Sequence, residues 1–315
     1  MILEVKNLKK YFEIKKGQFV HAVDDVSFSV GQNEILGLVG ESGCGKSTLG
    51  RTLVGLYDKT EGQVVFQGKV MPVSFTPKDY KNFSREIQMI FQDPYSSLNP
   101  RMTVQEVVAE GPMIHQMWAS DEVKEKVAFW LKRVGLSPDH MSRYPHEFSG
   151  GQRQRIGIAR ALALEPKVIV CDEPISALDV SVQAQVVNLL DDLKKTMGLT
   201  LIFIAHDLSM VRYISDRMAV MYLGALVELG PANDVYFDPL HPYTQSLIAS
   251  NPEADPKNER NRATHVLKGE IPSPINLKPG CRFASRCGKV MPECLTTTPV
   301  RKEVKPSRFV ACHLY

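Results

Sequence analysis

One glycine-rich run of the sequence reads Gly40-Glu41-Ser42-Gly43-Cys44-Gly45-Lys46-Ser47-Thr48. An apolar stretch, residues 34–39, precedes it, and a helix-forming stretch, residues 49–54, follows it. This order of strand, loop and helix is the context in which the pattern G-x-x-x-x-G-K-S/T binds phosphates, because glycine lets backbone N–H groups turn inward and the helix points its positive end at the same place. We therefore predict a nucleoside-triphosphate site in which Lys46 reaches the β- and γ-phosphates and Ser47 ligates Mg²⁺. The flanking elements argue against the alternative, a glycine-rich turn with a surface lysine.

Composition describes an ordinary globular chain of 315 residues, with 43% hydrophobic and 23% charged residues. The net charge of +3 is too small to indicate nucleic acid, but its distribution is uneven: from Glu253 onward there are twelve Lys/Arg against six Asp/Glu. This imbalance suggests a separate C-terminal segment. No run of 18 apolar residues and no signal peptide is visible, so we expect a cytosolic chain whose six cysteines are reduced or metal-bound.

Strands alternate with helices along the chain, which predicts a largely parallel sheet. A mostly helical insert is expected at about 95–160, and a proline-rich, irregular segment at 241–315, ordered by something other than a large core. The expected strands are 2–5, 19–30, 34–39, 63–66, 86–91, 167–172, 200–205, 217–222 and 225–229, and the expected helices are 49–54, 103–116, 121–134, 153–164 and 180–196.

Two acids, Asp172 and Glu173, end the apolar run 167–171. Next to a phosphate-binding loop, the first carboxylate can hold Mg²⁺ and the second can orient and deprotonate the attacking water. In isolation, the alternative would be a solvated acid pair in a loop. The run Ser149-Gly150-Gly151-Gln152 offers a second group of backbone donors ahead of a helix, although Gly-Gly before a helix is commonly only a turn.

These motifs occur in one order with Gln92, the run Ser176–Asp179 and His206, and over about residues 1–240 the chain resembles the ATP-binding subunit of an ABC transporter. The resemblance implies a P-loop NTPase fold of the ABC ATPase type, α/β, with a parallel-sheet core, an antiparallel β subdomain and a helical subdomain. It also implies that Glu173 is the catalytic base and that His206 contacts the γ-phosphate. Phe148 and Ile175 depart from the usual residues at their positions, but they replace no catalytic group.

The resemblance assigns site residues position by position. Tyr11 takes the place of the aromatic residue that stacks on adenine, with Phe12 and Phe19 as alternatives. The catalytic residues implied are Lys46, Gln92, Glu173 and His206. The residues implied for ATP are Tyr11, Gly40, Ser42, Gly43, Cys44, Gly45, Lys46, Ser47, Thr48, Gln92, Ser149, Gly150, Gly151, Gln152, Asp172 and Asp179, and those for Mg²⁺ are Ser47, Gln92 and Asp172.

In this family two ATPase subunits pair head to tail, and each ATP lies between the phosphate-binding loop of one and the Ser-Gly-Gly-Gln motif of the other. A narrower resemblance, carried by residues 91–100 and by His241-Pro242-Tyr243-Thr244, is to the oligopeptide/dipeptide importer branch, which includes nickel and some oligosaccharide systems. It implies a second, different ATPase subunit, two permease subunits, an extracytoplasmic solute-binding protein and a place on the cytoplasmic face of the cell membrane. Nucleic acid is not an expected partner. The implied function is to drive an importer of di- or oligopeptides by ATP binding and hydrolysis. The alternatives are the same ATPase in an importer of nickel or oligosaccharide, a soluble ABC ATPase without a transport role, and an iron–sulfur regulatory or redox module that keeps an ATPase fold.

Four cysteines lie in the C-terminal segment: Cys281, Cys287, Cys294 and Cys312. A segment with little apolar content and four thiols suggests a metal in place of a core. The closely spaced cysteine pairs that zinc prefers are missing, and the resemblance to this importer branch implies a 4Fe-4S cluster, with Zn²⁺, free thiols or disulfides as alternatives. Cys44 and Cys171 are expected to be packing residues.

Overall fold

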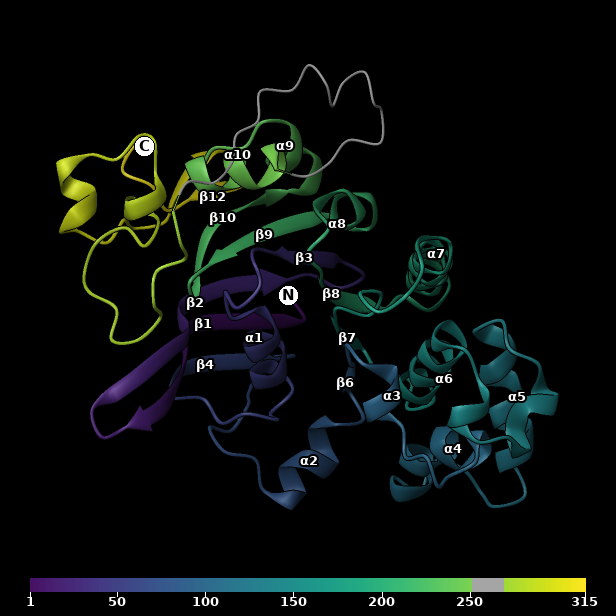
Figure 1. The fold of residues 1–315 in the computed structure, drawn as a ribbon. Helices are drawn as coiled ribbons and strands as arrows, with labels where there is room; N and C mark the ends of the chain where they lie inside the picture. The colour runs from purple at the N-terminus through teal and green to yellow at the C-terminus, as the bar shows by residue number, and fades with distance from the viewer. Residues whose placement is uncertain (251–268) are drawn as a thin grey trace, which may run out of the picture.

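The computed structural model describes residues 1–250 and 269–315, so residues 251–268 of the expected C-terminal segment lie outside the described part. Two sheets form the fold, with strand orders β2-β1-β4-β5 and β11-β12-β10-β9-β3-β8-β7-β6 (Figure 1). The strands are β1 (Leu3–Lys15), β2 (Gln18–Val30), β3 (Ile35–Val39), β4 (Glu61–Phe66), β5 (Lys69–Val70), β6 (Ile87–Ile90), β7 (Val168–Asp172), β8 (Thr200–Ile204), β9 (Arg217–Tyr222), β10 (Ala225–Pro231), β11 (Lys302–Lys305) and β12 (Arg308–Val310).

The helices lie around and beside these sheets (Figure 1). They are α1 (Lys46–Leu53), α2 (Pro77–Phe83), α3 (Pro94–Ser97), α4 (Val104–Ile114), α5 (Val123–Arg133), α6 (Gly150–Leu162), α7 (Val180–Met197), α8 (Leu208–Ile214), α9 (Ala232–Phe237) and α10 (Pro242–Ala249), with short 3-10 helices η1 (Pro138–Ser142), η2 (Pro145–Glu147), η3 (Ala284–Arg286) and η4 (Pro292–Leu295). Within the described residues, none of the helices combines the length and the apolar character needed to cross a bilayer.

The centre of the larger sheet is parallel, as the sequence predicts. β6, β7, β8, β3 and β9 pair in parallel, and every residue of β3, β7 and β8 is buried. Strands buried on both faces need continuous apolar runs, which is why these three segments show no alternation. Because parallel strands end at one edge of a sheet, the residues that follow β3, β6, β7 and β8 are brought together there.

The smaller sheet is antiparallel and consists mainly of the long β1–β2 hairpin. β1 continues through Tyr11 and Phe12 to Lys15, so the expected strand at 2–5 is too short. Register shifts between Val5 and Lys10 bend the hairpin, because a bulge in one strand locally disrupts pairing and increases twist.

A helical unit built from α3, α4, α5 and α6 stands at one side of the larger sheet (Figure 1). Thr103 caps α4 in a reciprocal arrangement: the backbone N–H of Glu106 donates to its hydroxyl, and its own N–H donates to the Glu106 carboxylate at 2.7 Å. α5 begins at Val123, not at 121, and Glu122 takes the N-cap position. The inner face of α5 is formed by its buried residues Val127, Trp130 and Leu131.

The C-terminal segment extends the larger sheet. β12 pairs with β10 and β11 pairs with β12, both antiparallel. Arg308 of β12, 4% exposed at its side chain, forms an ion pair of 3.1 Å with Glu228 of β10, whose side chain is fully buried. This segment is therefore ordered by sheet pairing and by a buried ion pair.

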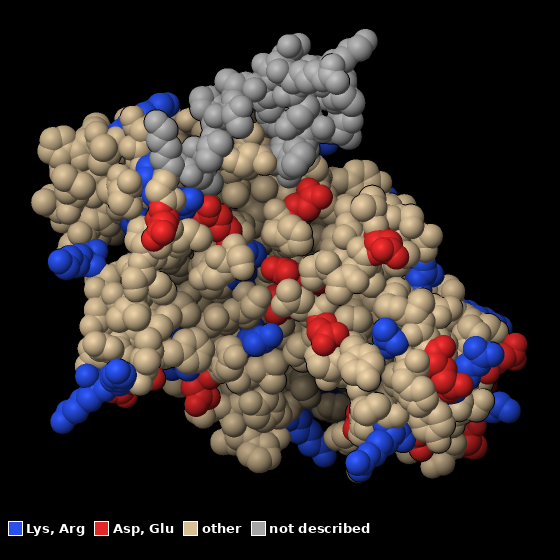
Figure 2. Space-filling model, in the orientation of Figure 1, with Lys and Arg blue, Asp and Glu red and all other residues tan. Residues whose placement is uncertain are grey.

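Figure 2 shows that most of this face is uncharged and that Lys/Arg and Asp/Glu side chains are both scattered over it.

Candidate functional site

The loop between β3 and α1 depends on its glycines. Gly45 has φ +105° and Gly40 has φ +153°. A Cβ atom on Gly45 would lie 1.9 Å from the carbonyl oxygen of Ala22, and one on Gly40 would lie 2.2 Å from that of Met221. Only glycine fits these two positions, because any side chain would collide with backbone.

The loop holds Lys46 in an almost fully buried position, 4% exposed. Its ammonium group donates to the carbonyl oxygens of Gly40, at 2.7 Å, and Glu41, at 3.1 Å. The charged end of Lys46 is therefore directed by two backbone carbonyls of the loop itself. A cavity of about 400 Å³ opens beside it, lined by Phe12, Val20, His21, Ala22, Ser42, Gly43, Gly45, Lys46, Ser47, Thr48, Gln92, Glu173, Leu223, Gly224 and Pro274.

Asp172 ends β7 against the first turn of α1. Its Oδ1 accepts a hydrogen bond of 2.7 Å from the hydroxyl of Ser47. Its buried Oδ2 has no hydrogen-bond partner in the described part of the chain, and Arg51 lies 3.8 Å away. Burial raises the pKa of this carboxyl group, because it disfavours the charged form. A hydroxyl, a carboxylate and the amide of Gln92 are the hard oxygen donors that Mg²⁺ prefers, and the unpartnered oxygen fits such an ion.

Glu173 lies at the rim of the same cavity in a left-handed conformation, with φ +45°. Its Oε2 accepts a hydrogen bond of 2.8 Å from the side-chain amide of Gln92 and lies 3.9 Å from Nδ1 of His206. Three residues that follow β6, β7 and β8 thus meet at one point. A strained backbone at a non-glycine residue is common where function requires a fixed side-chain direction.

The Ser-Gly-Gly-Gln motif begins α6. Ser149 is the N-cap residue, and its side chain and that of Gln152 bond each other's backbone N–H groups, at 3.3 and 3.1 Å. Gly151 packs so closely against Val182 that a Cβ atom would lie 2.4 Å from it. Ser149 and Asp179, the N-cap of α7, are both exposed, and neither this motif nor Asp179 lines the cavity beside Lys46. Within one chain, the Ser-Gly-Gly-Gln motif and Asp179 therefore lie apart from the residues that line the cavity beside Lys46.

Tyr11 and Phe12, two of the three aromatic residues considered for the adenine contact, are placed differently with respect to the cavity. The ring of Tyr11 stacks on His21 with centroids 4.1 Å apart, and its hydroxyl donates to Asp24. Phe12 and His21 line the cavity. Sequence reasoning did not select His21, Leu223, Gly224 or Pro274; only the Leu223-Gly224 turn between two expected strands gave a local signal.

Comparisons with known proteins agree on the family. A family model described as "ABC transporter" matches residues 23–176, and one described as "Oligopeptide/dipeptide transporter, C-terminal region" matches residues 227–294. The chain is 56% identical over 315 residues to the putative oligopeptide transport ATP-binding protein YkfD of Bacillus subtilis (strain 168), covering 100% of this chain and 95% of that protein. It is 53% identical over 310 residues to the oligopeptide transport ATP-binding protein OppF of Escherichia coli (strain K12), covering 95% and 92%.

The fold is similar to that of solved ATP-binding cassettes. The dimeric structure of the cassette MJ0796 in a post-hydrolysis state bound to ADP and Pi gives a TM-score of 0.67 at 27% identity, covering 73% of this chain and 98% of that one. The structure of cbiO1 from Clostridium perfringens, part of the transporter complex cbiONQ, gives a TM-score of 0.66 at 29% identity, covering 75% and 91%. The predicted ABC ATPase fold is confirmed.

The predicted iron–sulfur site is wrong. Among the described residues, which include Cys281, Cys287, Cys294 and Cys312, no group of three or more His, Cys, Asp or Glu is placed to hold a metal ion. The C-terminal family model and the two relatives are described by oligopeptide transport, and none of these descriptions names such an extension. The premise of a missing core also fails, because Phe283 is 2% exposed and packs into the main apolar cluster. The same finding gives no support to the zinc alternative at these cysteines.

Proposed function

Because the chain belongs to the oligopeptide/dipeptide branch of the ABC transporter ATP-binding proteins, we propose that its ATP hydrolysis drives uptake of di- or oligopeptides through membrane permease subunits. The chain is an ATP hydrolase of this family. The observation that supports the proposed site is the meeting of Lys46, Ser47, Gln92 and Glu173 on one cavity, with Asp172 bonded to Ser47.

In the proposed site the phosphate chain lies along the loop. Backbone N–H groups of residues 40–48 and the Lys46 ammonium bind phosphate oxygens, and Phe12, His21 and the neighbouring Tyr11 form the side that receives the base. Ser47, Asp172 and Gln92 would hold Mg²⁺, which neutralises charge on the phosphate oxygens when bound.

Glu173 is the proposed general base. The amide of Gln92 holds its carboxylate in one direction, so the other oxygen is free to accept a proton from an attacking water. His206, whose side chain is 64% exposed, lies on the outer side of Glu173 and is the proposed contact to the γ-phosphate.

A second ATPase subunit completes the site in this proposal. Ser149, Gly150, Gly151, Gln152 and Asp179 stand away from the chain's own phosphate-binding loop, so they are available to the nucleotide of a partner. The dimeric state described for the solved cassette supports this arrangement. We propose that the partner is a different chain, as the branch resemblance implies.

The remaining partners follow from the proposed role. Two permease subunits and an extracytoplasmic solute-binding protein would complete the importer, and the chain would be peripheral on the cytoplasmic face of the membrane. We propose that residues 1–240 are the ATPase domain, with the helical subdomain at about 95–160, and that 241–315 are the extension of this branch.

The test is peptide uptake in cells whose own copy of the chain carries Glu173→Gln. Loss of uptake of a labelled tripeptide, with normal amounts of the protein, supports the proposal, because the variant lacks the base but keeps the side-chain shape. The matched control is Glu165→Gln, an exposed residue after α6, which should leave uptake unchanged. Retained tripeptide uptake in the Glu173→Gln cells contradicts the proposal.

A further inference from the structure

The C-terminal segment contacts the phosphate-binding loop through a two-point ion pair. Nη1 of Arg286, in η3, donates to Oε2 of Glu41 at 2.7 Å, and Nη2 donates to Oε1 at 2.9 Å. The side chain of Arg286 is 4% exposed and that of Glu41 is 19% exposed. A guanidinium that binds both carboxylate oxygens fixes the plane and direction of the carboxylate, which a single contact does not.

Glu41 is also held through its backbone. Its N–H donates to the hydroxyl of Tyr243, in α10, at 2.8 Å, and its carbonyl oxygen accepts from the Lys46 ammonium at 3.1 Å. Tyr243 is fully buried and packs with Tyr222 and Phe283, with ring centroids 4.6 and 5.4 Å away. One residue of the loop therefore connects a rigid aromatic cluster and Arg286 to the ammonium group of Lys46.

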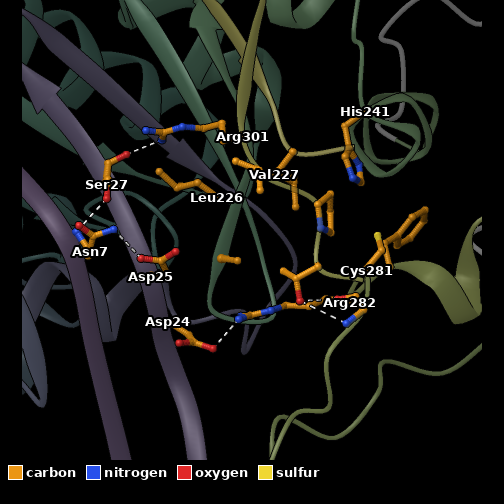
Figure 3. Close-up of a pocket in the computed structure, with 17 residues that line it drawn as sticks. Asn7, Asp24, Asp25, Ser27, Leu226, Val227, His241, Cys281, Arg282 and Arg301 are labelled. Carbon is orange, nitrogen blue, oxygen red and sulfur yellow. Dashed lines mark hydrogen bonds and ion pairs between the residues drawn. The ribbon is translucent and has the colours of Figure 1, made fainter. Parts of the chain in front are cut away.

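The same segment also contacts a second part of the cavity lining, the Leu223-Gly224 turn. Arg282 donates to Asp24, as Figure 3 shows, and also to the carbonyl oxygen of Leu223. Leu223 and Gly224 line the cavity beside Lys46. The N–H of Gly224 in turn donates to the carbonyl oxygen of Cys44 at 2.9 Å. The Leu223-Gly224 turn therefore links Arg282 to Cys44 of the phosphate-binding loop.

Residues 274–276 of the C-terminal segment run alongside β2. The N–H of His21 donates to the carbonyl oxygen of Pro274 at 3.0 Å, and the N–H of Asn276 donates to that of Phe19 at 3.0 Å. Pro274 itself lines the cavity. Backbone bonds at Pro274 and Asn276 hold this part of the segment along β2, with Pro274 at the side of the cavity formed by β1 and β2.

We propose that the C-terminal segment positions the phosphate-binding loop for nucleotide, and that Arg286, through its ion pair with Glu41, is the positioning residue. The inference rests on the proposed role of this loop. A loop held in its binding conformation loses less conformational freedom on binding than a loose one, so the ion pair favours ground state and transition state alike. Its removal weakens nucleotide binding and raises KM for ATP, while kcat changes little.

The experiment compares Arg286→Gln and Arg286→Lys with the intact chain. The dissociation constant of a fluorescent ATP analogue is expected to rise about 3- to 10-fold in Arg286→Gln, with KM for ATP rising in parallel and kcat within about twofold. Arg286→Lys keeps the charge but not the two-point contact, so it should restore only part of the affinity. Glu41→Gln, on the more exposed partner, tests the same pair if Arg286→Gln does not fold.

A matched control separates positioning from stability. Arg308 is equally buried in the same segment, and its ion pairs with Glu228 and Asp238 do not touch the loop. Arg308→Gln should lower the Tm without changing the affinity for the analogue. The double variant Glu41→Gln/Arg286→Gln should bind no more weakly than the weaker of the two single variants, because both remove one interaction.

Three results would overturn the inference: unchanged affinity in both Arg286→Gln and Glu41→Gln, additive losses in the double variant, or an equal loss of affinity in Arg308→Gln. Lys46→Ala tests the underlying assignment separately. If Lys46→Ala binds the analogue as the intact chain does, the proposed nucleotide site fails; if it does not bind, a negative result with Arg286 concerns the positioning role alone.

Discussion

The hydroxyl of Ser47 donates a 2.7 Å hydrogen bond to Asp172, a residue 125 positions later in the sequence. The bond joins the first turn of α1 to the end of β7. It brings together a hydroxyl and a carboxylate, one of whose oxygens is buried without a hydrogen-bond partner among the described residues. This pair belongs to the proposed Mg²⁺ site.

Asp172→Asn tests that pair. The amide keeps the shape of the carboxyl group and an oxygen that can accept from Ser47, but it removes the charge. We expect Mg²⁺-dependent phosphate release to fall about 100-fold or more, because a metal contributes several kcal/mol to a phosphoryl transition state. Phosphate release over a range of MgCl₂ concentrations checks this. Asp191→Asn, which breaks only the partly exposed pair with Lys195, should be indistinguishable from the intact chain.

Gln92→Ala tests the control of Glu173. Without the amide, the carboxylate of Glu173 is free to take other directions. A misdirected base lowers the rate of the chemical step, whereas the binding of ATP is retained. We expect kcat to fall about 10- to 100-fold with a smaller change in KM. Steady-state ATP hydrolysis gives both kcat and KM. The control is Gln63→Ala, a substitution at an exposed residue of β4, which should change neither constant. A rise in KM alone would show that the amide acts on nucleotide binding instead.

Gly45→Ala should abolish nucleotide binding and destabilise the chain. A Cβ atom there would meet the carbonyl oxygen of Ala22 at 1.9 Å, in a conformation with φ +105°. Gly157→Ala, inside α6 and with nothing within 4 Å of the added carbon, should instead raise the free energy of unfolding by about 0.5–1 kcal/mol. Urea unfolding measures both effects. Equal behaviour of the two variants would mean that the loop can relax around a side chain.

The stability of the chain should depend on pH through His241. Burial lowers the pKa of this residue to about 4, and its Nδ1 accepts the N–H of Tyr243 at 3.0 Å. In the unfolded chain the pKa returns to about 6.5, so the unfolded state binds more protons between these values. The free energy of unfolding should therefore fall by about 2 kcal/mol between pH 7 and pH 5 from this group alone.

His241→Asn isolates that contribution, because asparagine is a good N-cap residue that does not titrate. Denaturant unfolding at both pH values should show a smaller loss for the variant than for the intact chain. Glu228, which accepts the backbone N–H of His241, is present in both proteins, so its effect cancels. Parallel curves for the two proteins would exclude His241 as the source.

Sequence reasoning recovered the elements whose signal is local. Continuous apolar runs predicted the strands of the parallel core, and the helix expected at 103–116 corresponds to α4. The side of β1 that faces the cavity was not predictable, because the register of β1 shifts three times between Val5 and Tyr11, and each shift changes which of the following residues face one side of the strand.

Contacts between distant segments left no local trace in the sequence. The pair of Arg286 with Glu41 spans 245 positions, and the pairing of β12 with β10 depends on a buried partner for Arg308. The metal expectation failed for the same reason: the cysteine-bearing segment has few apolar residues, but Phe283 inserts into a core formed by other parts of the chain. Composition within a segment does not reveal a core that the segment shares.

The separation of Arg286 from Glu41 has a consequence for the order of synthesis. Residues 40–48 leave the ribosome early, whereas the arginine that holds Glu41 is made 245 residues later, roughly 10–50 s at ordinary elongation rates. During that interval the nascent loop lacks its two-point contact. A chain that stops before residue 286 would carry every residue of the phosphate-binding motif and still lack the support that this motif receives in the finished protein.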